Sequence, residues 1–223
     1  MGAPIGKNLA KNDFDVLGFE ADNSIKLPEI TMMPSITTLV KKVDIVFTIL
    51  RSGSIVNEFI NKFNPKITSI DCSTINVKTT KEVCQTLSKN KIHILNAQES
   101  CDVPRAKFDS LMFMVGGSKN HFDKLRFLFE YMGCRSVYFR KNGNGQTAKI
   151  CNNMIFKFTM IALCEALTLA DKLELDREAM FNIVSTSSGY NWSINSYCPA
   201  PGVGPKAPSN NSYTPGFSSD LML

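Results

Sequence analysis

Over the first two thirds of the chain, short runs rich in β-branched residues alternate with stretches in which apolar residues recur at helical spacing. This alternation is typical of βα units that build a parallel sheet with helices on its faces. The pattern therefore predicts an α/β fold. The expected strands are 15–20, 43–50, 67–71, 92–95, 111–115 and 136–139, and the expected helices lie near 35–41, 54–63, 79–87 and 119–131.

The pattern changes after residue 142, where the chain becomes helical. One long helical stretch is expected over 146–173, and Asp176 is placed to cap a second helix that ends at Gly189. The tail over 190–223 is rich in Pro, Ser, Asn and Gly, a composition that predicts a loop. We therefore expect two domains, which span residues 1–142 and 143–223.

The distribution of charge and apolar residues argues against two classes of partner. Lys and Arg number 25 against 20 Asp and Glu, but the basic residues are scattered, whereas phosphate binding favours a clustered basic face. The most apolar stretch, 154–170, is interrupted by Lys157 and Glu165, and this predicts a buried helix instead of a membrane span. We therefore expect neither a nucleic acid nor a membrane as partner.

The cysteines and histidines give no sign of a disulfide framework or a metal site. Seven cysteines are widely spaced and never form a Cys-x-x-Cys pair, which indicates a reducing compartment. The two histidines, His93 and His121, have no second His or Cys pair close by in sequence. Both are expected to be ordinary surface or strand-edge residues, and no metal is expected.

Lys149 and Asn153 are four residues apart in the long helical stretch and so lie on one face of it. A lysine amine can transfer a proton once its pKa is tuned, and an amide one turn further can orient a substrate hydroxyl or carboxylate. An alternative is a solvated lysine beside a surface asparagine. The spacing by itself favours this alternative.

Two further sets of polar residues stand at the ends of expected strands. Asp71–Ile75 follows the strand 67–71, where open α/β sheets place their ligand crevice, although a plain strand-to-helix turn with a Ser or Thr cap explains the same residues. Glu20 ends the strand 15–20 and follows Gly2 by 18 residues, near the separation at which a dinucleotide-binding unit keeps an acid for the adenosine ribose. Such an acid favours NAD over NADP, because it repels a 2′-phosphate.

Four stretches of the chain fit one known pattern. The most specific of them reads Gly-Asn-Gly-Gln-Thr-Ala-Lys-Ile-Cys-Asn-Asn, and another carries Trp192, Tyr197 and a Pro-Ala-Pro-Gly run. Together they resemble the β-hydroxyacid dehydrogenases, and specifically the animal-type 3-hydroxyisobutyrate dehydrogenase branch, over essentially the whole chain. The stretches are similar to the end of that family's dinucleotide fingerprint, its Asp-Ser-Ser-Thr segment, its catalytic helix and a loop region of its helical domain: 2–9, 71–75, 143–153 and 187–213.

The resemblance implies a fold and a reaction. The fold is a Rossmann-like parallel sheet, with its first strand missing here, followed by a long linking helix and a truncated all-α domain that usually pairs with another subunit. The reaction is the NAD-dependent oxidation of 3-hydroxyisobutyrate to methylmalonate semialdehyde in valine degradation, which in animals takes place in mitochondria. The expected partners are a small hydroxy acid and a second copy of the chain.

The resemblance also implies roles for eight residues. Lys149 relays the proton in catalysis, and Ser100 and Asn153 bind the substrate. NAD binding involves the remaining five, which are Gly2, Glu20, Leu50, Arg51 and Thr74.

The chain departs from the family pattern in three places. Only Gly2 remains of a strand and a three-glycine turn. The missing strand is the central one in the usual strand order, so its two neighbours, the second and fourth strands, are expected to keep unpaired backbone groups. Ser100-Cys101-Asp102 replaces a Ser-Gly-Gly turn, and Asp102 puts a negative charge near the substrate carboxylate. The chain also ends before a further lysine of the family. Two alternatives therefore stay open: a catalytically impaired fragment or silent binding module, and a related glyoxylate or succinic semialdehyde reductase.

Overall fold

The computed structural model describes residues 2–22, 24–100, 111–205 and 207–213. The chain divides into two compact units, Met1–Lys149 and Ile150–Leu223, and each is described by itself. Strands and helices alternate in the first unit, and the second is helical, so the predicted fold class is confirmed. The domain boundary after residue 142 stays a prediction.

The first unit is built on a five-stranded sheet with the strand order β3-β4-β5-β6-β7. Strands β3, β4 and β5 are parallel, β6 runs antiparallel to β5, and β7 is parallel to β6. The sheet is therefore mixed, not purely parallel as predicted. The sequence could not show this, because a run of β-branched residues predicts a strand but not its direction. The strands are β3 (Ile45–Thr48), β4 (Thr68–Asp71), β5 (His93–Ser100), β6 (Leu111–Gly117) and β7 (Gly133–Tyr138).

A second, smaller sheet consists of the parallel pair β1 (Leu17–Gly18) and β2 (Thr31–Met32). Strand β2 was not predicted, because two residues are too few to show an alternating pattern. Strands β1 and β3 belong to different sheets in the described part of the chain, and each is paired on one side only, as expected for strands that flank a missing one.

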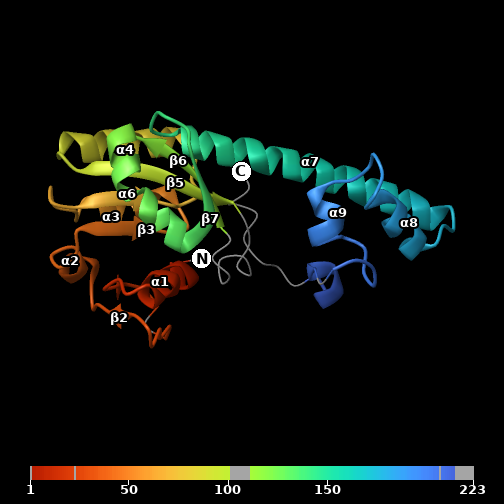
Figure 1. Cartoon of the computed structure of the whole chain (residues 1–223), viewed down its shortest axis with the longest axis horizontal. Helices are drawn as coiled ribbons and strands as arrows, with labels where there is room; N and C mark the ends of the chain where they lie inside the picture. Colours follow the sequence, from red (N-terminus) through yellow and green to blue (C-terminus); the bar gives the residue numbers. More distant parts are fainter. Residues whose placement is uncertain (1, 23, 101–110, 206, 214–223) are drawn as a thin grey trace. The chain divides into compact units, whose positions relative to one another are not determined.

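Helices cover both faces of the five-stranded sheet (Figure 1). One face packs against α1 (Gly2–Lys11) and α6 (Lys119–Met132). The other packs against α2 (Ile36–Leu39), α3 (Gly53–Ile60) and α4 (Val77–Lys89). Successive strand residues point to opposite faces, so each strand supplies both hydrophobic cores.

Side-chain caps decide where two of these helices begin. The Ser35 hydroxyl accepts a hydrogen bond from Thr38 N at 3.2 Å, and Thr38 Oγ1 accepts one from Ser35 N at 3.3 Å. This capping box confirms the predicted start of α2. Asn76 Oδ1 accepts a hydrogen bond from Thr79 N at 2.8 Å, so α4 begins earlier than its apolar pattern predicted.

The apolar spacing over 119–131 predicts a core-facing stripe that includes Phe127 and Tyr131, and this prediction is partly wrong. Phe127 and Tyr131 are 44% and 42% exposed, and their rings lie 6.2 and 5.2 Å from the ring of Phe14. Phe129 and Met132 are fully buried in the core beneath the helix. The helix face that packs against the sheet is therefore not the predicted one. Apolar residues lie on more than one face of α6, so their spacing alone did not identify the buried face.

The second unit is helical. Helix α7 (Asn144–Lys172) begins in the first unit, and α8 (Arg177–Val184), α9 (Trp192–Tyr197) and the short 3-10 helix η1 (Pro208–Asn211) follow it. Asp176 caps α8 as predicted, because its Oδ1 accepts a hydrogen bond from the backbone at 2.7 Å.

The prediction of a loop after residue 190 is wrong at α9. Asn191 Oδ1 accepts a hydrogen bond from Ile194 N at 3.1 Å and so caps this short helix. Ile194 is fully buried in a core with Leu163 and Leu167 of α7. The segment is rich in polar residues, so its composition did not indicate that Ile194 packs in a core.

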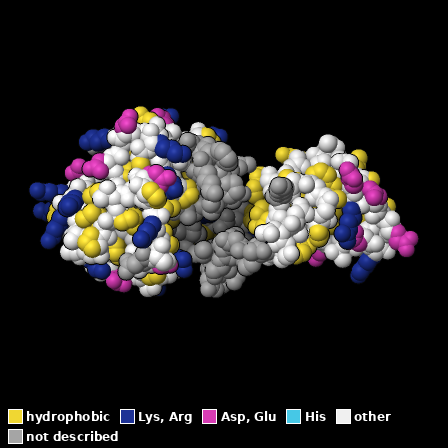
Figure 2. Space-filling view, turned by 90° about the horizontal axis from the view of Figure 1, so that it is seen from below, with side chains coloured by type: hydrophobic (Ala, Val, Ile, Leu, Met, Phe, Trp, Pro, Cys, Tyr) yellow, Lys and Arg dark blue, Asp and Glu magenta, His cyan; other side chains and the backbone are white. Residues whose placement is uncertain are grey.

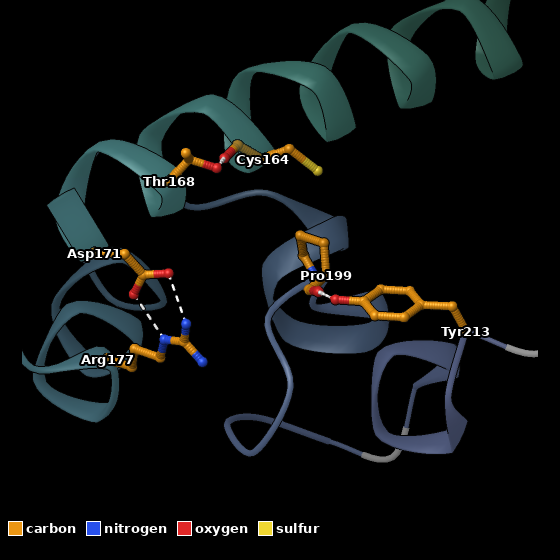
Figure 3. A network of polar contacts seen from close by, with 6 residues as sticks. All are labelled: Cys164, Thr168, Asp171, Arg177, Pro199 and Tyr213. Carbon is orange, nitrogen blue, oxygen red and sulfur yellow. Dashed lines mark hydrogen bonds and ion pairs between the residues drawn. The ribbon is translucent and has the colours of Figure 1, made fainter.

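Polar contacts join the end of α7 to the segments that follow it (Figure 3). Arg177 donates to both carboxylate oxygens of Asp171, at 2.6 and 2.7 Å, in a bidentate ion pair. The Tyr213 hydroxyl donates to the Pro199 carbonyl at 3.0 Å. These contacts are exposed, so solvent screening keeps their contribution to stability small. The core around Ile194 is the larger contribution.

Helix α7 presents apolar side chains to solvent. Ile155, Phe158 and Leu169 are 64%, 66% and 57% exposed, and Figure 2 shows hydrophobic side chains at the surface of this unit. By length and composition α7 is the one helix of the described chain that could cross a membrane, and 17% of its most apolar window is buried. The prediction of a buried helix is therefore wrong for the single chain.

The start of α7 lies against the main chain of the sheet. Gly143 N donates to Asn96 Oδ1 at 3.1 Å. A Cβ atom on Gly145 would overlap the Met114 carbonyl oxygen and would lie 3.0 Å from the Asn96 carbonyl oxygen. Two strands, β5 and β6, therefore fix where α7 begins, and only a residue without a side chain fits at position 145.

We expect Gly145→Ala to destabilise the first unit. Alanine favours a helix by about 1 kcal/mol over glycine, but overpacking against a backbone costs roughly 1–3 kcal/mol and no rotamer change relieves it. The expected net loss is about 1 kcal/mol, the middle of the resulting range, in the free energy of unfolding measured by urea titration. Gly189→Ala is the control, because its Cβ would meet one Val184 methyl group at 3.3 Å. An unchanged or higher stability of Gly145→Ala would contradict the packing argument.

Candidate functional site

The carboxyl ends of β3 and β4 are joined by a buried hydrogen-bond network. Asp71 Oδ1 accepts hydrogen bonds from the Thr48 hydroxyl at 2.8 Å and from Ser73 N at 3.1 Å. The Ser73 hydroxyl accepts one from Leu50 N at 3.0 Å. The cap of the following helix is Asn76, not a Ser or Thr, so the plain-turn interpretation of this segment is wrong in that detail.

Asp71 is almost fully buried, and burial raises its pKa above the ordinary value although hydrogen bonds from Ser73 and Thr48 oppose the shift. Its second oxygen, Oδ2, has no hydrogen-bond partner among the described residues. Gln98 lies beside it, with Nε2 donating to the Asp71 carbonyl at 3.3 Å. The site therefore holds buried acceptor groups at the ends of two adjacent strands.

Lys149 points at the end of β5. Its Nζ donates a hydrogen bond to the Glu99 carbonyl oxygen at 2.8 Å, and the side chain is half-buried. The alternative of a fully solvated lysine is therefore contradicted. Asn153 lies four residues further along the same helix and is half-buried.

Glu99 is a residue of the site that the sequence did not reveal. The expected strand 92–95 is in fact β5, which runs on to Ser100 and carries Glu99 into the interior. The side chain is 8% exposed, and its Oε2 has no hydrogen-bond partner among the described residues. Burial raises the pKa of Glu99 to about 7, against the opposing effects of its own main-chain hydrogen bond and of Lys149. The signal that could have found it is a carboxylate four residues after the apolar run 92–95.

The residues predicted to bind NAD lie near the ends of β1, β3 and β4. Gly2 begins α1, and a Cβ there would be in ordinary contact with Ile49, 3.7 Å away. Leu50 is half-buried and Thr74 is half-buried at the turn after β4. Gly2 therefore lies beside Ile49, the residue that precedes Leu50.

Glu20 and Arg51 are exposed. One oxygen of Glu20 accepts hydrogen bonds from Ala21 N at 2.9 Å and Asp22 N at 3.4 Å. The positive charge of Arg51 is near enough to Asp22 to contribute, after the Ser24 hydrogen bonds, to lowering its pKa. Arg51 therefore lies near the loop that follows Glu20.

Ser100 is the last residue of β5 and is half-buried. Cys101 and Asp102, which stand where the family has two glycines, lie outside the described residues. The substrate-binding role of this segment stays a prediction.

A dinucleotide fits the N-terminal end of this site. Helix α1 has no acidic side chain in its first turn, and the positive end of a helix suits an anionic pyrophosphate. Gly2 has no side chain to obstruct its backbone, and Glu20 has a second oxygen that can accept a hydrogen bond from a ribose hydroxyl. Within the described residues no group of three His, Cys, Asp or Glu side chains could hold a metal ion.

Two protein families match the chain. One, described as the NAD binding domain of 6-phosphogluconate dehydrogenase, matches residues 1–140, and the other, described as the NAD-binding domain of NADP-dependent 3-hydroxyisobutyrate dehydrogenase, matches residues 143–223. The first unit therefore carries an NAD-binding domain.

Curated relatives match over the entire chain. A probable 3-hydroxyisobutyrate dehydrogenase of Mycobacterium bovis is 33% identical over 78% of its own length, and the mitochondrial 3-hydroxyisobutyrate dehydrogenase of Mus musculus is 34% identical over 70%. The solved structure of the Mycobacterium tuberculosis 3-hydroxyisobutyrate dehydrogenase with L-serine superposes with a TM-score of 0.89 at 33% identity, over 100% of this chain and 79% of that one.

We expect the stability of the first unit to fall as pH rises from about 4.5 to about 7 because of Glu99. In that range the folded protein keeps a proton on Glu99 that the unfolded chain has released, so unfolding becomes easier as pH rises. The expected loss is on the order of 3 kcal/mol, because each tenfold change in an ionisation constant corresponds to about 1.4 kcal/mol. Glu99→Gln should flatten this dependence in urea titrations across the range, whereas Glu82→Gln, at an exposed position on α4, should leave it intact. Equal slopes in wild type and Glu99→Gln would refute the assignment.

Proposed function

The chain belongs to the 3-hydroxyisobutyrate dehydrogenase family, and from this premise we propose that it oxidises 3-hydroxyisobutyrate to methylmalonate semialdehyde with NAD, a step of valine degradation. The observation that supports the proposal is the position of Lys149, whose amine is held at the end of β5 by a hydrogen bond of 2.8 Å. A hydroxy acid oxidation needs such a group to take the hydroxyl proton.

The proposed reaction removes two hydrogens from the primary alcohol of the substrate. When bound, NAD supplies the nicotinamide ring that accepts a hydride from the alcohol carbon. The Lys149 amine accepts the hydroxyl proton as the carbonyl forms, and the same group returns a proton to the carbonyl oxygen in the reverse direction. The Glu99 carbonyl restrains the amine, so that less side-chain freedom is lost when the substrate binds.

The substrate would be held by two further side chains. We assign Asn153 to the hydroxyl or carboxylate, since it follows Lys149 by one helical turn, and Ser100 to the carboxylate. Both assignments come from the family resemblance.

The five cofactor positions divide by chemistry. Gly2 at the start of α1 would face the pyrophosphate, and Leu50, Arg51 and Thr74 would line the dinucleotide beyond the ends of β3 and β4. Glu20 would accept hydrogen bonds from the adenosine ribose and repel a 2′-phosphate, so NAD is preferred to NADP. Parallel binding titrations with NADH and NADPH test that preference, and equal affinities would count against the role of Glu20.

We expect Lys149→Met to lower kcat for 3-hydroxyisobutyrate oxidation by about 10²- to 10⁴-fold, the usual contribution of a general base. The absorbance of the NADH formed measures the rate. Lys172→Met, in the last turn of α7, is the control and should keep wild-type activity. A wild-type chain that folds cooperatively but shows no turnover would support the silent binding module instead, and turnover only with glyoxylate or succinic semialdehyde would support the related reductase.

A second copy of the chain would cover the apolar face of α7. This face exposes Met154, Phe158 and Ile161, at 55%, 66% and 55%. Burial of such side chains stabilises by about 1.5–3 kcal/mol each, which favours association.

We therefore expect Phe158→Glu to shift the protein from dimer or higher oligomer to monomer in analytical ultracentrifugation. Glu178→Lys, an exposed charge change on α8, should leave the mass unchanged. A wild-type chain that sediments as a monomer at high concentration would refute this proposal.

A mitochondrial location is proposed from the animal relatives, which are named mitochondrial in mouse and in Drosophila melanogaster. The mycobacterial relatives belong to bacteria, so the family by itself does not decide the compartment. Co-localisation of the tagged full-length protein with a mitochondrial marker tests this, and a diffuse cytosolic signal would refute it.

A further inference from the structure

Glu99 is placed to act on Lys149 in two ways. Its main-chain carbonyl accepts the Lys149 Nζ hydrogen bond at 2.8 Å, and its carboxyl group is close enough to feel the charge of the same amine. The carboxyl group is nearly inaccessible to solvent, and Oε2 finds no hydrogen-bond partner among the described residues. An ionised carboxylate in this place has little water to stabilise it, so a nearby cation favours the ionised form, although burial remains the larger effect on the pKa of Glu99.

We propose that Glu99 is a positioning residue that, when ionised, holds the Lys149 amine in its ammonium form and thereby adapts the site to donate a proton to a carbonyl group. The inference rests on the proposed function, because it concerns the protonation of the residue assigned to proton transfer. It does not alter the equilibrium of the reaction. The charge of Glu99 sets the pH range in which each direction of the reaction is fast. Reduction is fast at neutral pH, and oxidation is fast only at a pH at which the Lys149 amine has lost its proton.

The charged surroundings of Glu99 support this role. Strand β4 and the residue after it contribute two ionisable groups, Asp71 and Cys72, and α7 contributes Lys149. Burial raises the pKa of Glu99 most, and the charge of Asp71 adds to this rise. The main-chain hydrogen bond of Glu99 and the charge of Lys149 lower the pKa. Burial and the charges of both carboxyls raise the pKa of Cys72 well above its ordinary value, so this thiol stays neutral. Lys149 is thus the side-chain cation that opposes the burial of Glu99 within the described residues.

A rival explanation is that Glu99 is a tolerated buried acid that acts only on stability. The two explanations differ in a measurable way. A structural residue leaves the titration of Lys149 unchanged, whereas a charged partner raises its midpoint, because an opposite charge favours the ionised form.

The direct test is a titration of Lys149 in the full chain, followed by NMR after reductive methylation with ¹³C-formaldehyde. Lys149→Arg assigns the resonance. We expect Glu99→Gln to lower the Lys149 midpoint by about one pH unit or more, equal to a tenfold change in the ionisation constant. The other lysine resonances serve as the folding control, and Glu82→Gln should leave the midpoint where it is. An unchanged midpoint in a folded Glu99→Gln chain would overturn the proposal.

If Glu99→Gln does not fold, the titration of Glu99 in a Lys149 variant tests the proposal instead. In Lys149→Met the carboxyl group of Glu99 loses its cation, so its midpoint in ¹³C carboxyl NMR should rise, because coupling between two titrating groups is mutual. An unmoved Glu99 midpoint would overturn the proposal equally.

The pH dependence of turnover tests the same proposal through enzyme activity. In the oxidation direction, kcat/KM rises with pH as Lys149 loses its proton, and Glu99→Gln should move this rise to lower pH by the same amount as the NMR midpoint. Glu99→Asp, which keeps the charge, should restore the wild-type profile in part. If the wild type shows no turnover, the proposed function fails, and the NMR titration still decides the role of Glu99. A Glu99→Gln profile that coincides with the wild type would contradict the proposal.

Discussion

The approach of α7 to the sheet is the constraint on which the site depends. Gly145 brings the helix into contact with the carbonyl groups of Met114 and Asn96, and the Asn96 side chain holds the nearby residue Gly143. Lys149 follows Gly145 by one helical turn, so the same contact brings its amine to the Glu99 carbonyl. A displaced helix would separate the amine from the strand ends.

The sheet that supports this contact is divided. Strands β1 and β2 form a pair of their own, while β3 to β7 form the larger sheet. The residues assigned to NAD are distributed over both, with Glu20 after β1 and Leu50 after β3. Cofactor binding would therefore favour one arrangement of the two sheets, since a ligand that touches both stabilises the state in which both contacts exist.

Electrostatics distinguishes this site from a simple lysine at a strand end. Burial raises the pKa of both Asp71 and Glu99, and hydrogen bonds or the Lys149 charge compensate it only in part. At the proposed substrate position, negative charge on these groups would disfavour an anionic hydroxy acid, unless Glu99 is protonated or paired with Lys149. The charge state of the pair therefore connects the stability of the first unit with the proton chemistry proposed for it.

The sequence by itself determined the alternation of strands and helices, the cap at Ser35, the long helix that carries Lys149, and the family, since each depends on local periodicity or on a contiguous motif. Tertiary structure alone decided the antiparallel direction of β6, the exposure of Phe127 and Phe158, and the burial of Ile194. It also decided the partner of Lys149, which lies 50 residues away in sequence. Direction, exposure and long-range pairing depend on which surfaces meet, and no local pattern encodes that.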